Sequence, residues 1–505
     1  MKDKKRKSGI LLPVTALSSK HGIGCFSKEA YAFVDFLKEA GQSYWQVLPL
    51  GPTGYGDSPY QSFSTFAGNP YLIDLEELIS RGWLSAKECA AIDWGKNKEK
   101  TDYEKVYNNR FSLLKKAYKK SGIENDKEYK SFVKKNSFWL EDYALFMAIK
   151  EKYKGRSYSL WDEDLRLHKK KALDKIKNDP KIKSEAGCYR FIQFLFFEQW
   201  MRLKKYANEN GIEIIGDIPI YVAYDSSDSW SHPELFQFDE KGFPIAVAGC
   251  PPDYFSATGQ LWGNPLYRWD KHSETGFDWW IKRLKFCFDL YDVVRIDHFR
   301  GFEAYYSIPF GDPTAEFGHW EKGPGYELFK VMKEKLGEKD IIAEDLGYLT
   351  AGVKRLVKRT GYPGMKILEF AFDSAEDNDY LPHNYDKNCV VYTGTHDNDT
   401  AIGWYKNLRK KDQDFTKEYL GIKNAKNIGY ELIKLALGSV ADTAIIPMQD
   451  YLELGSEARI NTPSTLGGNW DWRMKEGCFD KKLAARIRRL SEIYGRCAAR
   501  STEDK

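Results

Sequence analysis

The sequence predicts an α/β fold, a (β/α)8 TIM barrel with inserted, largely helical subdomains between barrel strands. Eight short apolar runs recur along the 505 residues, and most of them are rich in Val, Ile and Leu. Helix-period stretches such as SKEAYAFVDFLKEAG (27–41) and GYELFKVMKEKLG (325–337) lie between several of these runs. Apolar runs that alternate with amphipathic helices are typical of parallel strands covered by helices, and eight such strands form a barrel.

Each expected strand ends in a polar or glycine-containing loop. We expect strands at GILLPV (9–14), YWQVLPLGP (44–52), EIIGDIPIYV (213–222), DVVRIDHF (292–299), DIIAEDLG (340–347), MKILEFAF (365–372), CVVYTGTHD (389–397) and TAIIPMQD (443–450). The first run follows MKDKKRK, and together they imitate a secretory signal. Because the apolar stretch is short and contains Pro13, we read it as a buried strand behind a solvated basic tail.

The spacing of the strands is uneven and indicates insertions. Residues 53–212 separate the second strand from the third, far more than a crossover helix requires, and include Lys-rich helical sequence. We therefore predict one catalytic barrel domain over residues 1–505, with a helical subdomain inserted at 65–205. We predict a second, aromatic-rich insertion at residues 223–291.

Composition limits the classes of function. With 42% apolar and 30% charged residues, the chain can bury a large core, and its net charge of +4 indicates neither a nucleic-acid nor an acidic-membrane partner. No run reaches the roughly 18 apolar residues of a membrane helix. The eight cysteines form no CxxC pair, so we expect free thiols in a reducing, cytoplasmic compartment. The oligomeric state is left open.

Charged residues gather where the strands end. In a parallel barrel these ends meet at one rim, where active sites form. Several strand ends carry carboxylates together, which favours a site over isolated helix caps. The strand-end residues are Asp217, then Arg295, Asp297 and His298, then Glu344 and Asp345, then His396, Asp397 and Asp399, and finally Asp450.

VVRIDHFRG (293–301) shows why one of these strands is unusual. Alternation places Val293, Arg295 and Asp297 on one face, with Val294, Ile296 and His298 on the other. An ion pair on a strand buried on both faces indicates a site. We expect the Arg295 guanidinium to favour the charged form of Asp297 at neutral pH.

Two chemistries use such a ring of carboxylates. Metal hydrolases in barrels usually have a His-x-His pair on the first strand, and GILLPVTALSS lacks one. Glycosyl transfer needs a carboxylate nucleophile and a carboxylic acid donor. Asp297 suits the nucleophile, and a residue on the next strand suits the acid. Periodicity alone does not choose Glu344 over Asp345, or Asp397 over Asp399.

IDHFRG, AEDLG and GTHDND, in this order, resemble the conserved regions of the α-amylase superfamily. Three further stretches are similar to the 4-α-glucanotransferases (amylomaltase or disproportionating enzyme, glycoside hydrolase family 77): GPTGYGDSPYQSFS (51–64), AGCPPDYFSATGQLWGNPLYRW (248–269) and NTPSTLGGNWDWR (461–473). With GDIPIYV (216–222), the resemblance runs from near residue 12 to near residue 473. Cys250 and Ser464 depart from the pattern, which leaves only fine specificity in doubt.

The resemblance implies that the insertion at 223–291 includes a loop over the substrate cleft, and it implies roles for individual residues. Asp297 would be the nucleophile, Glu344 the acid/base and Asp397 the transition-state stabiliser. The residues implied in binding the substrate are Tyr60, Asp217, Tyr254, Phe255, Trp262, Arg295, His298 and His396. We expect a retaining double displacement on α-1,4-glucans and maltooligosaccharides, with roughly 5–5.5 Å between the Asp297 and Glu344 carboxyl groups, and with no cofactor or metal.

Three alternatives remain open at this stage. A plain α-glucan hydrolase would share the three carboxylates and would not lengthen its products. A metal-dependent barrel hydrolase would lose activity to chelators. A glucan-binding protein without activity would lack one of the three carboxylates, and all three are present.

Overall fold

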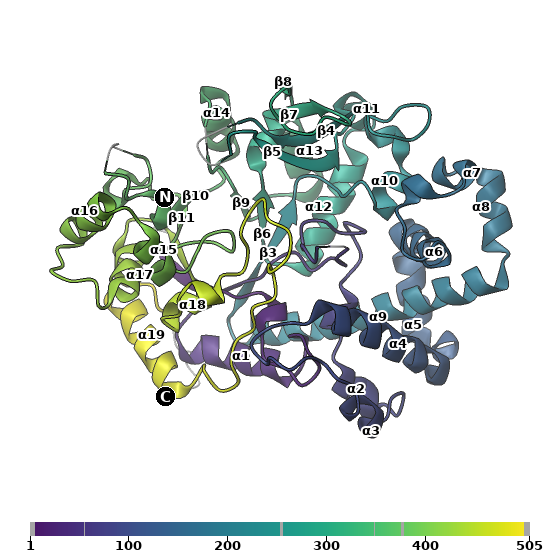
Figure 1. The fold of residues 1–505 in the computed structure, drawn as a ribbon, viewed down its shortest axis with the longest axis horizontal. Helices are drawn as coiled ribbons and strands as arrows, with labels where there is room; N and C mark the ends of the chain where they lie inside the picture. Colours follow the sequence, from purple (N-terminus) through teal and green to yellow (C-terminus); the bar gives the residue numbers. More distant parts are fainter. Residues whose placement is uncertain (1–5, 55, 253–255, 348, 375–377, 499–505) are drawn as a thin grey trace.

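The protein forms a parallel barrel in the computed structural model, which describes residues 6–54, 56–252, 256–347, 349–374 and 378–498 (Figure 1). Eight parallel strands lie in the order β10-β11-β12-β1-β2-β3-β6-β9. They are β1 (Lys7–Leu11), β2 (Tyr44–Gln46), β3 (Glu213–Pro219), β6 (Val293–Asp297), β9 (Ile341–Ala343), β10 (Gly364–Ile367), β11 (Cys389–Tyr392) and β12 (Thr443–Pro447). Each lies within or overlaps one of the eight expected runs, so the predicted barrel is confirmed.

The seam between β9 and β10 closes the barrel. The backbone N–H of Ala343 donates to the carbonyl oxygen of Pro363 at 3.0 Å. The N–H of Met365 donates at 2.8 Å to the carboxylate of Asp345. At the seam between β9 and β10, the Asp345 carboxylate thus accepts a hydrogen bond that a backbone carbonyl accepts elsewhere in the sheet.

The two faces of the strands pack against different partners. The barrel interior holds one apolar cluster, with members from seven strands: Leu11, Ile215, Val293, Ile342, Met365, Ile367, Val390, Tyr392 and Ile445. Val294 and Ile296 belong to the larger cluster shared with the surrounding helices. The alternation predicted for residues 293–297 is therefore confirmed, with Val293 inside and its neighbours outside.

Helices occupy most of the connections between strands. The helices are α1 (Lys28–Glu39), α2 (Leu75–Ser80), α3 (Ala86–Ala90), α4 (Tyr103–Ser121), α5 (Lys127–Lys135), α6 (Ser137–Lys152), α7 (Glu163–Arg166), α8 (Lys170–Lys177), α9 (Pro180–Glu209), α10 (Ser227–Ser231), α11 (Trp269–Glu274), α12 (Asp278–Leu290), α13 (Tyr326–Leu336), α14 (Ala351–Thr360), α15 (Ala401–Asn407), α16 (Lys410–Leu420), α17 (Ile428–Gly438), α18 (Met448–Tyr451) and α19 (Lys481–Ile493). In α1, Ala30, Phe33, Val34 and Leu37 are buried, the i, i+3, i+4, i+7 pattern of a helix with one face on a core.

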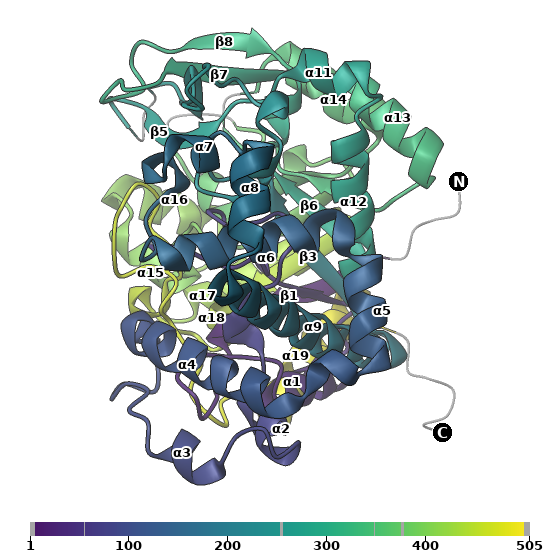
Figure 2. The same ribbon diagram turned by 90° about the vertical axis from the view of Figure 1, so that its right-hand side faces the viewer.

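The long connection from β2 to β3 is largely helical and runs from α2 to α9. Its helices lie beside the barrel and appear in blue in Figures 1 and 2. Helix α9 spans 30 residues, starts with Pro180 at its first position, and is capped by Asp179, which accepts from the N–H of Lys181 at 2.9 Å. It packs both on α6 and on β3, so it belongs both to the inserted helices and to the wall of the barrel.

A second sheet, which the sequence did not reveal, lies above the barrel in Figure 1. Its antiparallel strands follow the order β5-β4-β7-β8. They are β4 (Ala246–Cys250), β5 (Gln260–Pro265), β7 (Ala304–Pro309) and β8 (His319–Lys322). The strand β8, HWEK, is mostly exposed and has no apolar run, so periodicity offered no signal for it.

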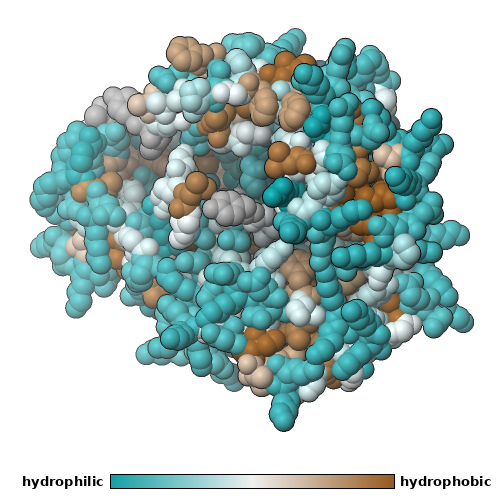
Figure 3. All heavy atoms as spheres, turned by 45° about the vertical axis from the view of Figure 1, so that its right-hand side comes forward, coloured by the Kyte–Doolittle hydropathy of each residue, from teal (hydrophilic) through white to brown (hydrophobic). Residues whose placement is uncertain are grey.

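Most of the abundant aromatic side chains are interior. The segments WSHPELFQF (230–238) and FDWWIKRLKF (277–286) place Trp230, Phe236 and Trp280 in the core. The face in Figure 3 is mainly hydrophilic, with apolar groups scattered over it. The eight cysteines form no disulfide. Across the described residues, no helix is long and apolar enough to cross a membrane.

Candidate active site

The register of three neighbouring strands brings the predicted residues together. Asp217 on β3 lies opposite Arg295 on β6, and Ile296 lies opposite Ala343 on β9. The ladder continues one step further, because Glu344 N–H donates to Ile296 O at 3.1 Å and Phe299 N–H donates to Glu344 O at 3.1 Å. Asp297 and Glu344 therefore emerge side by side from adjacent strands, at the carboxyl end of the barrel where active sites form.

Arg295 is the centre of a buried charge cluster. Its Nη1 donates to both carboxylate oxygens of Asp217, at 2.8 and 2.7 Å, and its Nη2 donates to Asp297 Oδ1 at 3.0 Å. The Arg295 and Asp217 side chains are 4% and 0% exposed, whereas Asp297 is 29% exposed at the mouth. Arg295 thus has a dedicated partner in Asp217, and its remaining nitrogen holds the proposed nucleophile in place.

The protonation of Asp297 differs from the simple expectation. Burial raises the pKa of Asp297 to about 6; the Arg295 guanidinium opposes this shift, and the charges of Asp217 and Asp397 add to it. The effect of Arg295 has the predicted sign, but desolvation outweighs it. Asp297 is still mostly ionised at neutral pH, which is the form that a nucleophile requires.

The strand ends at Asp297, and His298 takes a left-handed backbone conformation with φ of 53°. The predicted alternation was therefore wrong for His298, which does not continue the outer face of the strand. The backbone N–H of His298 donates at 2.6 Å to Glu344 Oε2. Its ring meets Trp262 edge-on, with 4.8 Å between ring centroids. The turn thus orients the candidate acid and brings an aromatic side chain of β5 to the site.

Glu344, rather than Asp345, faces the charge cluster. Its second oxygen accepts from Leu346 N–H at 2.8 Å. Burial and the nearby charge of Asp297 raise the pKa of Glu344 to about 7, against the opposing effects of Arg295 and the two backbone donors. The carboxylate of Asp345 is bound at the barrel seam by Met365 N–H. The structure therefore separates two acids that the sequence left equivalent.

Asp397 lies in a turn after β11 and is surrounded by donors. Asn461 Nδ2 donates to Asp397 Oδ1 at 2.6 Å, and His396 Nε2 lies 3.4 Å from the other oxygen. Burial favours its neutral form, but the charge of His396 and the hydrogen bonds from His396 and Asn461 outweigh that effect and lower the pKa of Asp397 to about 2. Arg459 holds the same turn by donating to the backbone oxygen of Asp397 at 2.7 Å.

The other carboxylates near this turn have structural partners. Asp399 accepts from Ser456 Oγ and from the N–H of Thr400, the residue that caps α15. Asp450 accepts from Thr393 Oγ1 and Ala401 N–H. Asp397 is consequently the residue of this segment that reaches the site, which resolves the second alternative left by the sequence.

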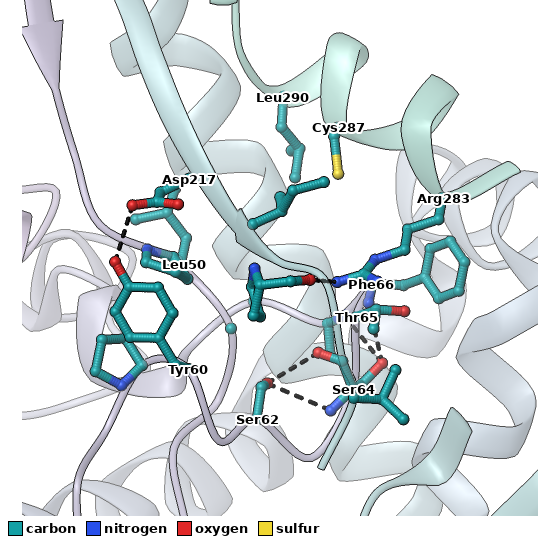
Figure 4. A pocket seen from close by; sticks show the side chains of 18 of the residues that line it. Leu50, Tyr60, Ser62, Ser64, Thr65, Phe66, Asp217, Arg283, Cys287 and Leu290 are labelled. Carbon is teal, nitrogen blue, oxygen red and sulfur yellow. Dashed lines mark hydrogen bonds between the residues drawn. The ribbon is translucent and has the colours of Figure 1, made fainter. Parts of the chain in front are cut away.

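Tyr60 connects the two sides of the site. Its hydroxyl donates to Asp217 Oδ2 at 2.8 Å and lies 2.9 Å from His396 Nε2. Figure 4 shows the Tyr60 hydroxyl pointing at Asp217, with Arg283 and Phe66 on the far side of a cavity of about 50 Å³ that Tyr60 and Asp217 also line. A chain of polar contacts thus leads from Asp297 through Arg295 and Asp217 to the Tyr60 hydroxyl. From there it continues through His396 to Asp397.

Two predicted residues cannot be placed, and two residues that hold the site together were not predicted. Tyr254 and Phe255 lie outside the described residues. Asn461 and Arg459, which hold Asp397, were not predicted, although Asn461 opens the NTPSTLGGNWDWR stretch. In the described part of the chain, no group of three or more His, Cys, Asp or Glu side chains has the arrangement of a metal site.

Comparison with known proteins identifies the family. The sequence pattern of the 4-alpha-glucanotransferase family matches residues 12–479. A 4-alpha-glucanotransferase of Clostridium butyricum is 50% identical over 486 residues, which cover 96% of this chain and 99% of that protein. One from Thermus thermophilus is 48% identical, over 97% of this chain and 99% of that protein. The structure of an amylomaltase from Streptococcus agalactiae in complex with acarbose superposes with a TM-score of 0.94 at 42% identity, covering 98% of this chain and 100% of the other.

The chain therefore belongs to the 4-alpha-glucanotransferase family, glycoside hydrolase family 77, whose activity is the transfer of glucan segments. The resemblance found in the sequence is confirmed over nearly the whole chain. The enzyme class and the barrel predicted from the sequence are confirmed with it.

Proposed function

We propose that the protein transfers α-1,4-glucan segments by a retaining double displacement in which Asp297 is the nucleophile and Glu344 the acid/base. One observation carries this assignment. The two carboxyl groups leave adjacent strands side by side, each one residue beyond the Ile296–Ala343 pair. Their environments give Asp297 the lower pKa, about 6, and Glu344 the higher, about 7. Between these values one group is mostly charged and the other mostly protonated, as a nucleophile and its acid partner must be.

In the first step Glu344 gives its proton to the glycosidic oxygen. The bond from that oxygen to the anomeric carbon breaks while a carboxylate oxygen of Asp297 attacks the carbon, and a covalent glycosyl ester forms. The shortened chain leaves with a free 4-hydroxyl. In the second step Glu344, now ionised, takes the proton of an acceptor's 4-hydroxyl, whose oxygen attacks the anomeric carbon and releases Asp297.

Asp397 stabilises the positive charge that develops on the sugar in both steps. Its depressed pKa, about 2, keeps it ionised wherever Asp297 is ionised. Arg295 and Asp217 fix the nucleophile from below, and Tyr60 links them to His396. His298, His396 and Trp262 contact the sugar, with Tyr60, Arg295, Asp217, Tyr254 and Phe255 completing the binding residues that we assign. α-1,4-Glucans and maltooligosaccharides are the substrates.

Transfer in place of hydrolysis requires that a sugar, not water, reaches the intermediate. We assign this role to the loop within 250–262, together with the insertions at 65–205 and 223–291, which build acceptor subsites and exclude solvent. Shortening the loop should raise the ratio of hydrolysis to transfer on maltotriose. An unchanged ratio would remove the loop from the account.

The first experiment is incubation of the purified protein with maltotriose alone, with products resolved by chain length. Glucose together with a ladder of longer maltooligosaccharides is the expected result. Maltose and glucose without longer products would make the protein a hydrolase and contradict the acceptor subsites. No reaction from folded protein would contradict the proposed function as a whole.

A further inference from the structure

Glu369 is a buried acid that the mechanism above does not use. It lies in the 3-10 turn Leu368–Phe370, directly after β10, and is 9% exposed. Its backbone N–H donates to the carbonyl oxygen of Thr393 at 3.2 Å. Thr393 follows β11 and begins the segment that carries His396 and Asp397. The backbone of Glu369 is therefore joined to the start of the Asp397 turn.

The side chain of Glu369 packs against the same segment. A Cβ atom placed on Gly394 would lie only 2.6 Å from Glu369 Oε1 and 3.1 Å from Cβ of Asn398. Gly394 is not among the residues with positive φ, so its backbone does not require glycine. What the position requires is space, and the Glu369 carboxyl fills that space.

The surroundings of the carboxyl group disfavour a charge. Glu369 Oε1 is buried and has no hydrogen-bond partner. Arg459, whose charge acts on Glu369, directs its hydrogen bonds to the backbone oxygens of Asp397 and Asn461, both at 2.7 Å. Burial, with Asp450 and Asp399 close by, raises the pKa of Glu369 well above its usual range, and Arg459 and Asn398 oppose this only in part. Burying a charged carboxylate with one oxygen unpaired is costly, whereas the neutral acid is tolerated.

We propose that Glu369 is a positioning residue: an uncharged carboxylic acid that supports the turn from Gly394 to Asn398 and thereby fixes Asp397. It acts through the backbone of the turn, with no contact to substrate. Asn398 takes part from within the turn, because its Oδ1 accepts from the N–H and the hydroxyl of Thr395, at 2.9 and 2.8 Å. The inference rests on the proposed role of Asp397 as the stabiliser of the transition state.

Two substitutions at Glu369 test the shape and the charge separately. Glu369→Gln keeps the volume and is neutral, so kcat and KM for maltotriose should stay within about twofold of the parent enzyme. Glu369→Ala leaves the turn unsupported and should displace Asp397. The displacement should lower kcat by about 10–100-fold with little change in KM. A Gln variant as impaired as the Ala variant, or an Ala variant with unchanged kcat, would overturn the inference.

The pH dependence of stability gives an independent readout. Because the folded pKa of Glu369 is raised, its contribution to stability is complete below its unfolded pKa and is lost as the pH rises through the folded pKa. Glu369→Gln escapes that loss, so its Tm relative to the parent should increase between pH 5 and pH 9. A Gln variant that becomes less stable than the parent at pH 9 would show that the anion is paired and stabilising.

Gly394→Ala supplies the matched test of contact. In the parent chain the added methyl group meets Glu369 Oε1 at 2.6 Å and should lower kcat. In the Glu369→Ala background only the milder 3.1 Å contact with Asn398 Cβ is left, so the substitution should cost several-fold less. An equal loss of kcat in both backgrounds would show that the contact between residue 394 and Glu369 does not matter for activity. Asp397→Asn separates the two proposals: if it barely changes kcat, the role of Asp397 fails, and if it abolishes activity while Glu369→Ala does not lower kcat, only this inference fails.

Discussion

The two sides of the barrel mouth hold carboxylates in opposite electrostatic states. On the side built from β6 and β9, Asp297 and Glu344 are desolvated next to each other, and their pKa values rise to about 6 and about 7. On the side of the turn after β11, Asp397 accepts from Asn461 beside His396, and its pKa falls to about 2. The comparison shows that the protonation of an acid in this site follows from the balance between its desolvation and the charges and donors around it, and not from its residue type.

The largest effect is expected on the first side. Asp297→Ala removes the group that forms the covalent intermediate, so activity on maltotriose should fall by at least about 10⁴-fold. The fold should survive, since Arg295 keeps Asp217 as its partner. Product analysis and thermal unfolding measure the two results. The control is Asp399→Asn, because the Asp399 carboxylate has structural partners on the other side of the barrel mouth. This variant should retain most of the activity.

A smaller loss is expected for Glu344→Gln, which keeps the shape and removes the transferable proton. Activity on maltotriose should drop by roughly 10²–10⁴-fold. A donor such as an α-maltosyl fluoride, whose leaving group needs no proton, should recover part of the first step. Asp345→Asn is the matched neighbour: it weakens the bond to Met365 N–H at the seam and should lower Tm more than kcat. If the two variants behaved alike, the assignment of the acid would be wrong.

The pH profile tests the raised pair directly. Since Asp297 must be ionised, kcat/KM should rise with pH up to about 6, and since Glu344 must be protonated, it should fall above about 7. On the acidic and the basic limb of the profile, kcat/KM should change by about tenfold per pH unit. Asp397, with its pKa of about 2, should add no limb in this range. A profile that is flat from pH 5 to pH 8 would contradict the contrast between the two sides.

The smallest effect is expected where the two sides meet. Tyr60→Phe removes the hydroxyl between Asp217 and His396 but leaves the ring and its stacking on His396. Loss of one hydrogen bond to a charged group is worth about 1.5 kcal/mol, so kcat/KM should fall by roughly tenfold. A loss as large as that of Asp297→Ala would mean that Tyr60 takes part in the chemistry itself.

Much of the fold was predictable because it is encoded locally. The eight strands were found from continuous apolar runs, and the inward face of Val293, Arg295 and Asp297 followed from the two-residue period of a strand. The antiparallel sheet escaped because β8 is short and exposed, so burial left no pattern in its sequence. The left-handed conformation of His298 escaped as well, because no glycine marks that turn.

The sequence by itself determined the barrel, the family, and the small set of acids that meet at its mouth, since strand periodicity and strand ends are properties of a few consecutive residues. Only the tertiary structure decided what each acid does. Barrel closure pairs the Asp345 carboxylate with Met365 N–H and leaves Glu344 beside Asp297. The pKa of Asp397 is lowered by its neighbour His396 and also by Asn461, which lies 64 residues further along the chain. The physical reason is that a pKa depends on desolvation and on the donors within reach, and those partners come from distant parts of the chain that only folding brings together.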